Sequence, residues 1–171
     1  NNIVVSTVMS NYGFKQAIEK FNFDLIETPV GDKYVAEAMK KYDAALGGEQ
    51  SGHIIISDLL PVGDGLVTLI YVLKAMQHFG VALSDFKREH LYEYPQKLTN
   101  LELENKLNDE ELEYINQIAL DMSIKKDLDG RYLIRNSGTE PLLRVLVEAK
   151  SNEAMEDFSN ELITKINKYL N

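Results

Sequence analysis

Short β-branched segments alternate with segments of helical periodicity through the first half of this chain, and this alternation constrains the fold more than any other feature. Ile3 to Met9 and Phe23 to Glu27 have the composition of strands, and apolar residues at helical spacing follow each of them. The second of these helices is expected over Asp32 to Tyr42. Strands and helices in alternation build a layered α/β structure. We therefore expect an α/β domain with a mixed sheet in this half.

A long apolar segment closes the first half. Gly63-Asp64-Gly65 is expected to open a helix that runs to about Phe79 and ends at Gly80. Its apolar composition predicts a buried helix. A short helix and a connection follow over Ser84 to Tyr94, and the pattern changes at Pro95. The expected domains are therefore 1–93 and 94–171.

The second half has a different order of elements. A strand is expected over Leu98 to Leu103, and Asn108-x-x-Glu111 resembles the capping box of a helix. Two strands follow, Arg131 to Arg135 and Leu142 to Ala149, and an amphipathic helix is expected over Asn152 to Leu170. The order β-α-β-β-α predicts a smaller α+β domain. The residues expected to face inward from the last helix are Met155, Phe158, Leu162, Ile166 and Tyr169.

Composition limits the ligands and partners. A chain of 171 residues with 44% hydrophobic residues can bury a core, and its formal net charge of −9 argues against broad contact with nucleic acid. The absence of cysteine fits a reducing cytoplasm. The longest apolar run, Val67 to Leu73, is shorter than the roughly 20 residues of a membrane span. We expect a cytoplasmic protein that binds a small anion, with neither nucleic acid nor membrane as partner.

Two arginines flank a polar turn in the second half, a combination typical of a phosphate site. Ser137, Gly138 and Thr139 can offer hydroxyls and backbone N–H groups around a glycine that is free to take positive φ. Arg135 and Arg144 can bind phosphate oxygens through paired N–H groups. An ordinary polar turn is the alternative for an isolated Ser-Gly-Thr. Two of the chain's four arginines within ten residues favour the phosphate site.

A second polar loop, Gly47 to His53, lies between two apolar segments. Its three glycines allow a tight turn and a close approach of backbone to ligand. Glu49 can accept hydrogen bonds from two adjacent hydroxyls, and Ser51 can donate or accept one. This chemistry suits a sugar ring, although an ordinary tight turn explains the loop equally well when it is considered alone.

Five motifs, in order, resemble one enzyme family. They are Thr7 to Asn11, Val30 to Val35, Gly47 to His53, Gly63 to Leu66 and Arg135 to Val147. Together they resemble the bacterial phosphoglucosamine mutases, a branch of the α-D-phosphohexomutases. The resemblance covers only the third and fourth domains of such enzymes, so it implies a C-terminal fragment. Residues 1–93 would be the sugar-recognition domain, and 94–171 a phosphate-binding, TBP-like domain.

The resemblance implies an activity for the parent enzyme. That enzyme would interconvert glucosamine 6-phosphate and glucosamine 1-phosphate through a phosphoserine and a glucosamine 1,6-bisphosphate intermediate, feeding UDP-N-acetylglucosamine and peptidoglycan synthesis. The serine and the Mg²⁺ loop would belong to missing N-terminal domains, the partners of this fragment, and the parent could be a homodimer. Asp127 to Gly130 matches the magnesium loop poorly and is interpreted as a turn. No metal ligand is expected in this chain, and the isolated fragment is expected to be inactive.

The resemblance also assigns roles to residues. Glu49 and Ser51 would bind ring hydroxyls, while Lys33 and His53 match positions near the reacting phosphate, as a cation and a proton acceptor. A solvated surface lysine and a structural histidine are the alternatives for these two. The residues that would hold the phosphate that is not reacting are Arg135, Ser137, Gly138, Thr139 and Arg144.

Three positions depart from the family pattern. Asn136 stands where many members have proline and is expected to loosen the phosphate loop. Lys33 stands where many have arginine, which keeps the charge but loses the paired donors. Val62 stands where threonine often precedes Gly-Asp-Gly.

Two other functions stay open from the sequence. One is the corresponding part of a phosphomannomutase or phosphoglucomutase, which comparison of hexose phosphates as substrates of the parent would distinguish. The other is a non-catalytic module that binds phosphosugars and never had an N-terminal half.

Overall fold

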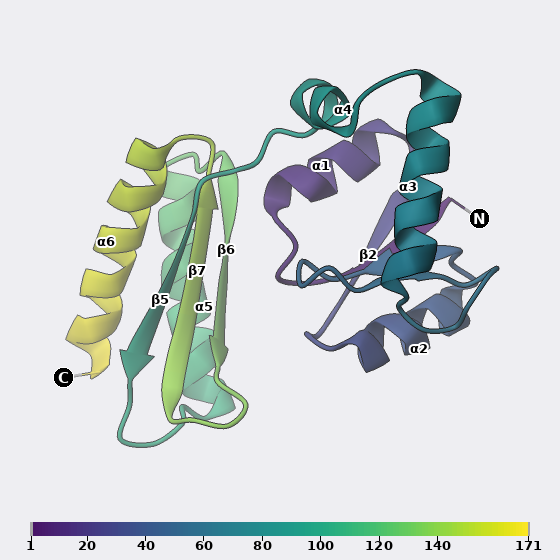
Figure 1. Cartoon of the computed structure of the whole chain (residues 1–171). Coiled ribbons are helices and arrows are strands. Elements are labelled where there is room, and N and C mark those ends of the chain that lie inside the picture. The colour runs from purple at the N-terminus through teal and green to yellow at the C-terminus, as the bar shows by residue number, and fades with distance from the viewer. Residues whose placement is uncertain (1, 171) are drawn as a thin grey trace. The chain divides into compact units, whose positions relative to one another are not determined.

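The computed structural model describes residues 2–170 and divides into two compact units, with the boundary in the chain between Glu93 and Tyr94. Figure 1 labels most of their helices and strands. The first unit is built on a four-stranded sheet in the order β2-β1-β3-β4. Its strands are β1 (Ile3–Thr7), β2 (Asp24–Thr28), β3 (Leu46–Gly48) and β4 (Ile54–Ile56). β1 pairs in parallel with β2 and β3, and β4 pairs antiparallel with β3, so the sheet is mixed, as expected.

Four helices accompany this sheet: α1 (Tyr12–Lys20), α2 (Asp32–Tyr42), α3 (Gly65–Phe79) and α4 (Leu83–His90). The Asn11 side chain accepts from the Gly13 N–H at 3.0 Å and so caps α1. Val35 and Met39 of α2 are buried with Val5 of the sheet, which forms the small core of the unit. Asp64 caps α3 by accepting from the backbone N–H groups of two residues in its first turn.

The expectation that α3 is buried is wrong. None of its residues is buried. Several of its apolar side chains are at least half exposed, namely Leu66 (74%), Leu69 (52%), Ile70 (52%) and Leu73 (53%). The physical reason is that this helix is apolar on more than one side, while the sheet of its unit can cover only one of them.

The second unit has the order β5 (Gln96–Glu102), α5 (Asp109–Lys125), β6 (Gly130–Asn136), β7 (Leu142–Ala149) and α6 (Asn152–Leu170). Its strands form an antiparallel sheet in the order β5-β7-β6. This confirms the expected β-α-β-β-α domain. Asn108 and Glu111 form the expected capping box of α5.

The core of the second unit is larger and joins both helices to the sheet. It includes Ile115, Ala119 and Met122 from α5, Ile134, Leu143, Val145 and Val147 from the sheet, and Met155, Phe158, Leu162 and Ile166 from α6. Tyr169 was expected to face inward as well, but it is 42% exposed. Its ring lies 4.7 Å from that of Tyr114, so it packs at the surface between α5 and α6.

The connection between the units is held at both of its ends. A Cβ on Gly13 would lie 1.7 Å from the Tyr92 carbonyl oxygen, so the backbone of Tyr92 packs directly on α1. The Tyr94 hydroxyl donates to Asp129 at 3.1 Å, and the Pro95 carbonyl accepts from the Ala149 N–H at 3.2 Å. Tyr92 is therefore fixed in the first unit, and Tyr94 in the second.

Within residues 2–170, no single helix combines the length and hydropathy of a membrane span; α3 and α4 meet both criteria only as a pair, bent by 76°.

Candidate functional site

Arg135 and Arg144 lie opposite each other on β6 and β7. Directly opposed residues of an antiparallel pair project from the same face of the sheet. The hairpin therefore places two guanidiniums side by side, although they are nine positions apart in sequence. The turn that joins the strands carries Ser137, Gly138 and Thr139.

The two arginines are in an unusual electrostatic environment. Burial, and then the neighbouring charge of Arg144, lower the pKa of Arg135 below its ordinary value. Arg144 approaches Glu140, with 3.8 Å between Nη2 and Oε2. Its Nε atom is buried and has no hydrogen-bond partner among the residues that the structure describes. The site thus holds excess positive charge and an unused donor, which is what an anion would satisfy.

The turn itself is organised by Ser137. Its backbone N–H donates to the Leu142 carbonyl at 2.8 Å, and its hydroxyl accepts from the Glu140 N–H at 3.4 Å. The residue is only 2% exposed, so its hydroxyl serves the turn. Thr139 is exposed. Gly138 does not take the positive φ that the sequence allowed, and a Cβ there would meet nothing within 4 Å.

Two residues support this turn: Lys106, which sequence reasoning missed, and Asn136, which it expected to act in the opposite way. Lys106 Nζ donates to the Gly138 carbonyl at 2.6 Å. The Asn136 amide accepts from the Leu107 N–H at 3.3 Å and donates to the Leu107 carbonyl at 2.8 Å. Asn136 therefore ties the hairpin to the segment before α5 instead of loosening it. No local signal could have identified Lys106, because it lies 32 positions before its partner.

The second candidate loop is the turn between β3 and β4. The Glu49 N–H donates to the His53 carbonyl at 2.9 Å, and the Gly52 N–H donates to the Glu49 carbonyl at 3.0 Å. Gly52 has a φ of +93°, which side chains rarely allow. A Cβ on Gly48 would lie 2.8 Å from the His53 carbonyl oxygen. The glycines of this loop are thus required by its own packing.

The structure brings Glu49 to the start of α2. Its Oε1 atom accepts from the Gly31 N–H at 2.9 Å, where the helix dipole favours a carboxylate. Lys33 lies in the first turn of the same helix. Its side chain is 75% exposed, with Nζ 3.9 Å from Glu37 Oε1. Gly31 is a partner of the loop that sequence reasoning did not identify.

His53 lies next to the start of α3. A Cβ on Gly63 would be 2.8 Å from His53 Cδ2, so the glycine makes room for the ring. Both His53 and Ser51 are exposed. The predicted residues of the first unit therefore gather on one loop and the adjacent helix starts, while those of the second unit gather on the β6–β7 hairpin.

Side chains that could bind a metal ion are not clustered in the described part of the chain. Among residues 2–170, no cluster of three or more histidine or acidic side chains could hold an ion. Asp127 occupies a turn with φ of 49°. Asp129 accepts hydrogen bonds from Lys150 and Tyr94, which lower its pKa. The residues present do not fit a magnesium site.

Known proteins match both units of this chain. Residues 1–94 match the profile of phosphoglucomutase/phosphomannomutase, alpha/beta/alpha domain III, and residues 98–165 match the C-terminal domain of the same family. The phosphoglucosamine mutase of Streptococcus agalactiae is 46% identical over 157 residues, which are 91% of this chain and 35% of that protein. The chain thus spans about a third of this relative's length.

Solved structures give the same fold. The Aspergillus fumigatus N-acetylphosphoglucosamine mutase in complex with GlcNAc-6P and magnesium matches with a TM-score of 0.77 at 20% identity, covering 99% of this chain and 42% of that one. The same fungal enzyme in complex with glucose 1,6-bisphosphate also matches at 0.77, with 21% identity, covering 98% of this chain and 38% of that one. With both of its units matched in order, this chain belongs to the phosphoglucomutase/phosphomannomutase family, of which it carries domain III and the C-terminal domain.

Proposed function

We propose that this chain is the sugar-recognition and phosphate-anchoring part of a phosphoglucosamine mutase. The complete enzyme would interconvert glucosamine 6-phosphate and glucosamine 1-phosphate. The name of the relative at 46% identity supports this substrate. The phosphoserine and Mg²⁺ would lie in other domains, so the fragment alone would bind ligand without turning it over.

The paired arginines carry the proposal for a phosphate anchor. Arg135 and Arg144 face each other in register, and burial together with the charge of Arg144 lowers the pKa of Arg135. A phosphate dianion would offset both charges and accept from the unused Nε of Arg144. Thr139 and the open space beside Gly138 would let its oxygens approach the turn backbone.

The affinity expected for the isolated chain is modest. Two or three charge-assisted hydrogen bonds contribute about 1.5–3 kcal/mol each. Ordering the ligand and the loop opposes this gain. The balance corresponds to a Kd of roughly 1 mM.

The Gly47 to His53 loop would bind the sugar ring. Gly31 orients the Glu49 carboxylate through Oε1, and a ring hydroxyl can donate to the same group. Ser51 is exposed beside it. Lys33 would support phosphoryl transfer as a cation, and His53 as a proton acceptor. Both side chains are exposed, so a bound substrate could reach them.

We place the hinge of the complete enzyme at Glu93. Tyr92 is packed on Gly13, and Tyr94 is bonded to Asp129. Pro95 also restricts the backbone of Tyr94. Glu93 is the residue between these anchors, so its dihedral angles would absorb a reorientation of the two domains. Scattering curves of the complete enzyme should change when bisphosphate is added, and Glu93→Pro should reduce the change.

An NMR titration with glucosamine 6-phosphate tests the anchor directly. Amide shifts should centre on residues 135–144 and should be lost in Arg135→Ala and Arg144→Ala. Arg88→Ala is the matched control, because Arg88 is 78% exposed and paired with Asp85 at 2.8 Å in the other unit. Loss of the shifts in this control as well would indicate nonspecific charge attraction. An absence of shifts at tens of millimolar ligand would count against a preformed anchor.

Glucose 6-phosphate and mannose 6-phosphate extend the same titration. Shifts of equal size for all three ligands around residues 135–144 are expected, because that loop would hold only phosphate. Shifts around residues 47–53 should be largest for the amino sugar. A larger response there to mannose 6-phosphate would favour a phosphomannomutase.

A further inference from the structure

The β6–β7 turn contains backbone donors that the protein itself does not use. The Ser137 N–H donates to the Leu142 carbonyl, and the Glu140 N–H donates to the Ser137 hydroxyl. Within residues 2–170, the N–H groups of Gly138 and Thr139 have no acceptor. A ligand at the turn could therefore accept a hydrogen bond from either group, provided that the group points toward it.

Lys106 fixes the direction of one of these two donors. Its Nζ atom donates to the Gly138 carbonyl at 2.6 Å. This carbonyl and the Thr139 N–H belong to the same peptide group, which is trans. In a trans peptide the C=O and N–H bonds point in opposite directions. The Thr139 N–H therefore points away from the Lys106 ammonium.

The two arginines lie on the face of the sheet opposite to the helices. Leu143 and Val145 of β7 belong to the core that α5 and α6 form with the sheet. Arg144 stands between these two residues, and successive side chains of a strand project from opposite faces. Arg144, together with Arg135 opposite it in register, therefore projects from the face that does not carry the helices.

Lys106 approaches the turn from the helix side. Leu103 and Leu107 of the same segment pack against the core. The Leu103 N–H donates to the Pro141 carbonyl at 2.9 Å, and Leu107 is bonded to the Asn136 amide. The segment is thus tied to the hairpin on both sides of the turn. Figure 1 shows the loop between β5 and α5 and the β6–β7 turn at the same end of the second unit.

We propose that Lys106 is a positioning residue of the phosphate site. By holding the Gly138 carbonyl on the helix side, it directs the Thr139 N–H toward the face of Arg135 and Arg144, where this N–H donates to the bound phosphate. The inference rests on the phosphate anchor proposed above and adds to it a residue from outside the hairpin. No carboxylate competes for the ammonium, because Lys106 forms no ion pair within residues 2–170.

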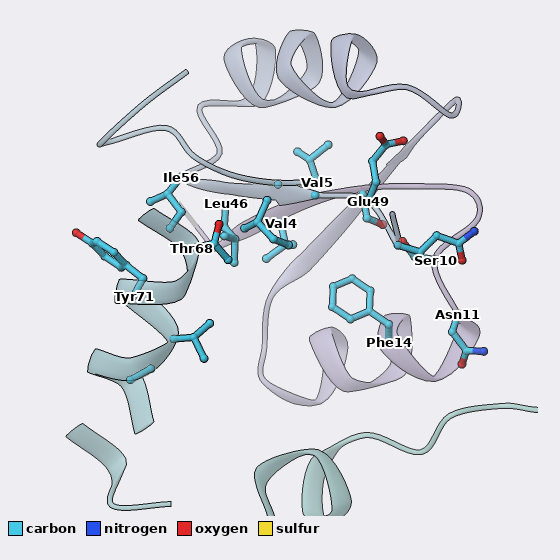
Figure 2. Close-up of a pocket in the computed structure, with 17 residues that line it drawn as sticks. Val4, Val5, Ser10, Asn11, Phe14, Leu46, Glu49, Ile56, Thr68 and Tyr71 are labelled. Atoms are coloured by element: carbon cyan, nitrogen blue, oxygen red, sulfur yellow. The ribbon is translucent and has the colours of Figure 1, made fainter. Parts of the chain in front are cut away.

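The cavity of the first unit is a poor alternative site for the phosphate. It has a volume of about 570 Å³ and lies between α1, α3 and the sheet. Figure 2 shows Val4, Leu46 and Phe14 around this space. Among the described residues that line it, the one charged side chain is Glu49, a carboxylate. An apolar space beside a carboxylate disfavours a phosphate dianion, whereas the hairpin offers cations and free N–H groups.

An NMR titration that follows the Thr139 amide tests the proposal, with glucosamine 6-phosphate as the ligand. In the unmodified chain, the Thr139 amide proton should move downfield and rank among the largest shifts. In Lys106→Met this shift should fall to the size of the shifts outside the turn, and Kd should rise about fivefold. Lys106→Arg keeps a cationic donor and should restore both quantities.

Lys125→Met is the matched control. Lys125 is exposed at the far end of α5, so this variant removes the same charge from the same unit without touching the turn. It should leave the Thr139 shift and Kd unchanged. An equal loss of affinity in Lys125→Met would overturn the proposal in favour of a general effect of net charge.

Ligand-free spectra separate positioning from simple stabilisation of the fold. Lys106 is exposed, so Lys106→Met should keep native dispersion, with shifts confined to residues near the turn. A Thr139 response in Lys106→Met equal to that of the unmodified chain would overturn the positioning role, as would a failure of Lys106→Arg to restore it. If the turn shifts persist in Lys106→Met and vanish in Arg144→Ala, the anchor stands without Lys106. An unmodified chain that shows no shifts at residues 135–144 would overturn both proposals.

Discussion

The two candidate loops use glycine for different reasons. In the Gly47 to His53 loop, a Cβ on Gly47 would lie 2.4 Å from Met39 Sδ, a Cβ on Gly48 would clash with the His53 carbonyl, and Gly52 has positive φ. In the β6–β7 turn, Gly138 has neither constraint. The first set of glycines is explained by the fold alone. Gly138 is not, and the proposed phosphate site would account for a glycine at this position.

Gly48→Ala should have the largest effect on stability. The new methyl group would meet backbone 2.8 Å away and Ile54 Cδ1 2.9 Å away, so the β3–β4 hairpin would have to shift. Overpacking of this kind costs about 1–3 kcal/mol, and contact with backbone places this variant near the upper end. Urea unfolding followed by circular dichroism measures the loss. If Gly48→Ala were as stable as the unmodified chain, packing would not require glycine in the Gly47 to His53 loop, and the two loops would not differ in this respect.

Asn136→Ala should destabilise the second unit by about 1–2 kcal/mol, because two hydrogen bonds to Leu107 are lost and its partly buried backbone N–H and carbonyl are left without these partners. Asn160→Ala is a suitable control, since Asn160 is exposed and its side chain accepts from Lys97 at the surface. A native-like or higher melting temperature for Asn136→Ala would mean that the side chain does not tie the hairpin down.

Gly138→Ala sharpens the comparison by separating stability from binding. Its methyl group would enter open space without backbone strain, so the free energy of unfolding should stay within about 0.5 kcal/mol. Binding of glucosamine 6-phosphate should weaken by about tenfold, or ~1.4 kcal/mol. Calorimetric titration alongside thermal unfolding gives both quantities. Unchanged affinity would show that ligand does not approach this glycine.

The smallest expected effect is an acid sensitivity of the second unit. Hydrogen bonds from Lys150 and Tyr94 lower the pKa of Asp129 below 3.8 in the folded state. The carboxylate therefore adds stability above pH 3.8, and this contribution is lost as the pH falls through the lowered value. Asp129→Asn should reduce the difference between melting temperatures at pH 6 and pH 3. The difference will be small, because Asp129 is about half exposed.

Much of the fold could be predicted from local patterns. Asp32–Tyr42 and Asn152–Leu170 were predicted with the bounds that the structure has, because each combines a clear apolar face with end signals. The capping box at Asn108 and the closure of α3 at Gly80 are local as well. The exposure of α3 could not be predicted. Composition reveals that a helix is apolar, but not whether its own unit can cover every side of it.

The candidate site shows the same division. Its motifs are contiguous in sequence, so the sequence alone located both loops and both arginines. Which groups meet depended on pairing between distant segments. The register of β6 and β7 set Arg135 against Arg144, and the tertiary fold brought Lys106 to Gly138 and Gly31 to Glu49.

The sequence by itself determined the element types, the two-part organisation and the chemistry of the loops, because helical periodicity, caps and turn residues act over a few positions. Only the tertiary structure decided that the glycines of one loop serve packing while Gly138 is left open, and that apolar side chains of α3 are exposed. Those properties depend on contacts between segments that are distant in sequence, and no local pattern encodes them.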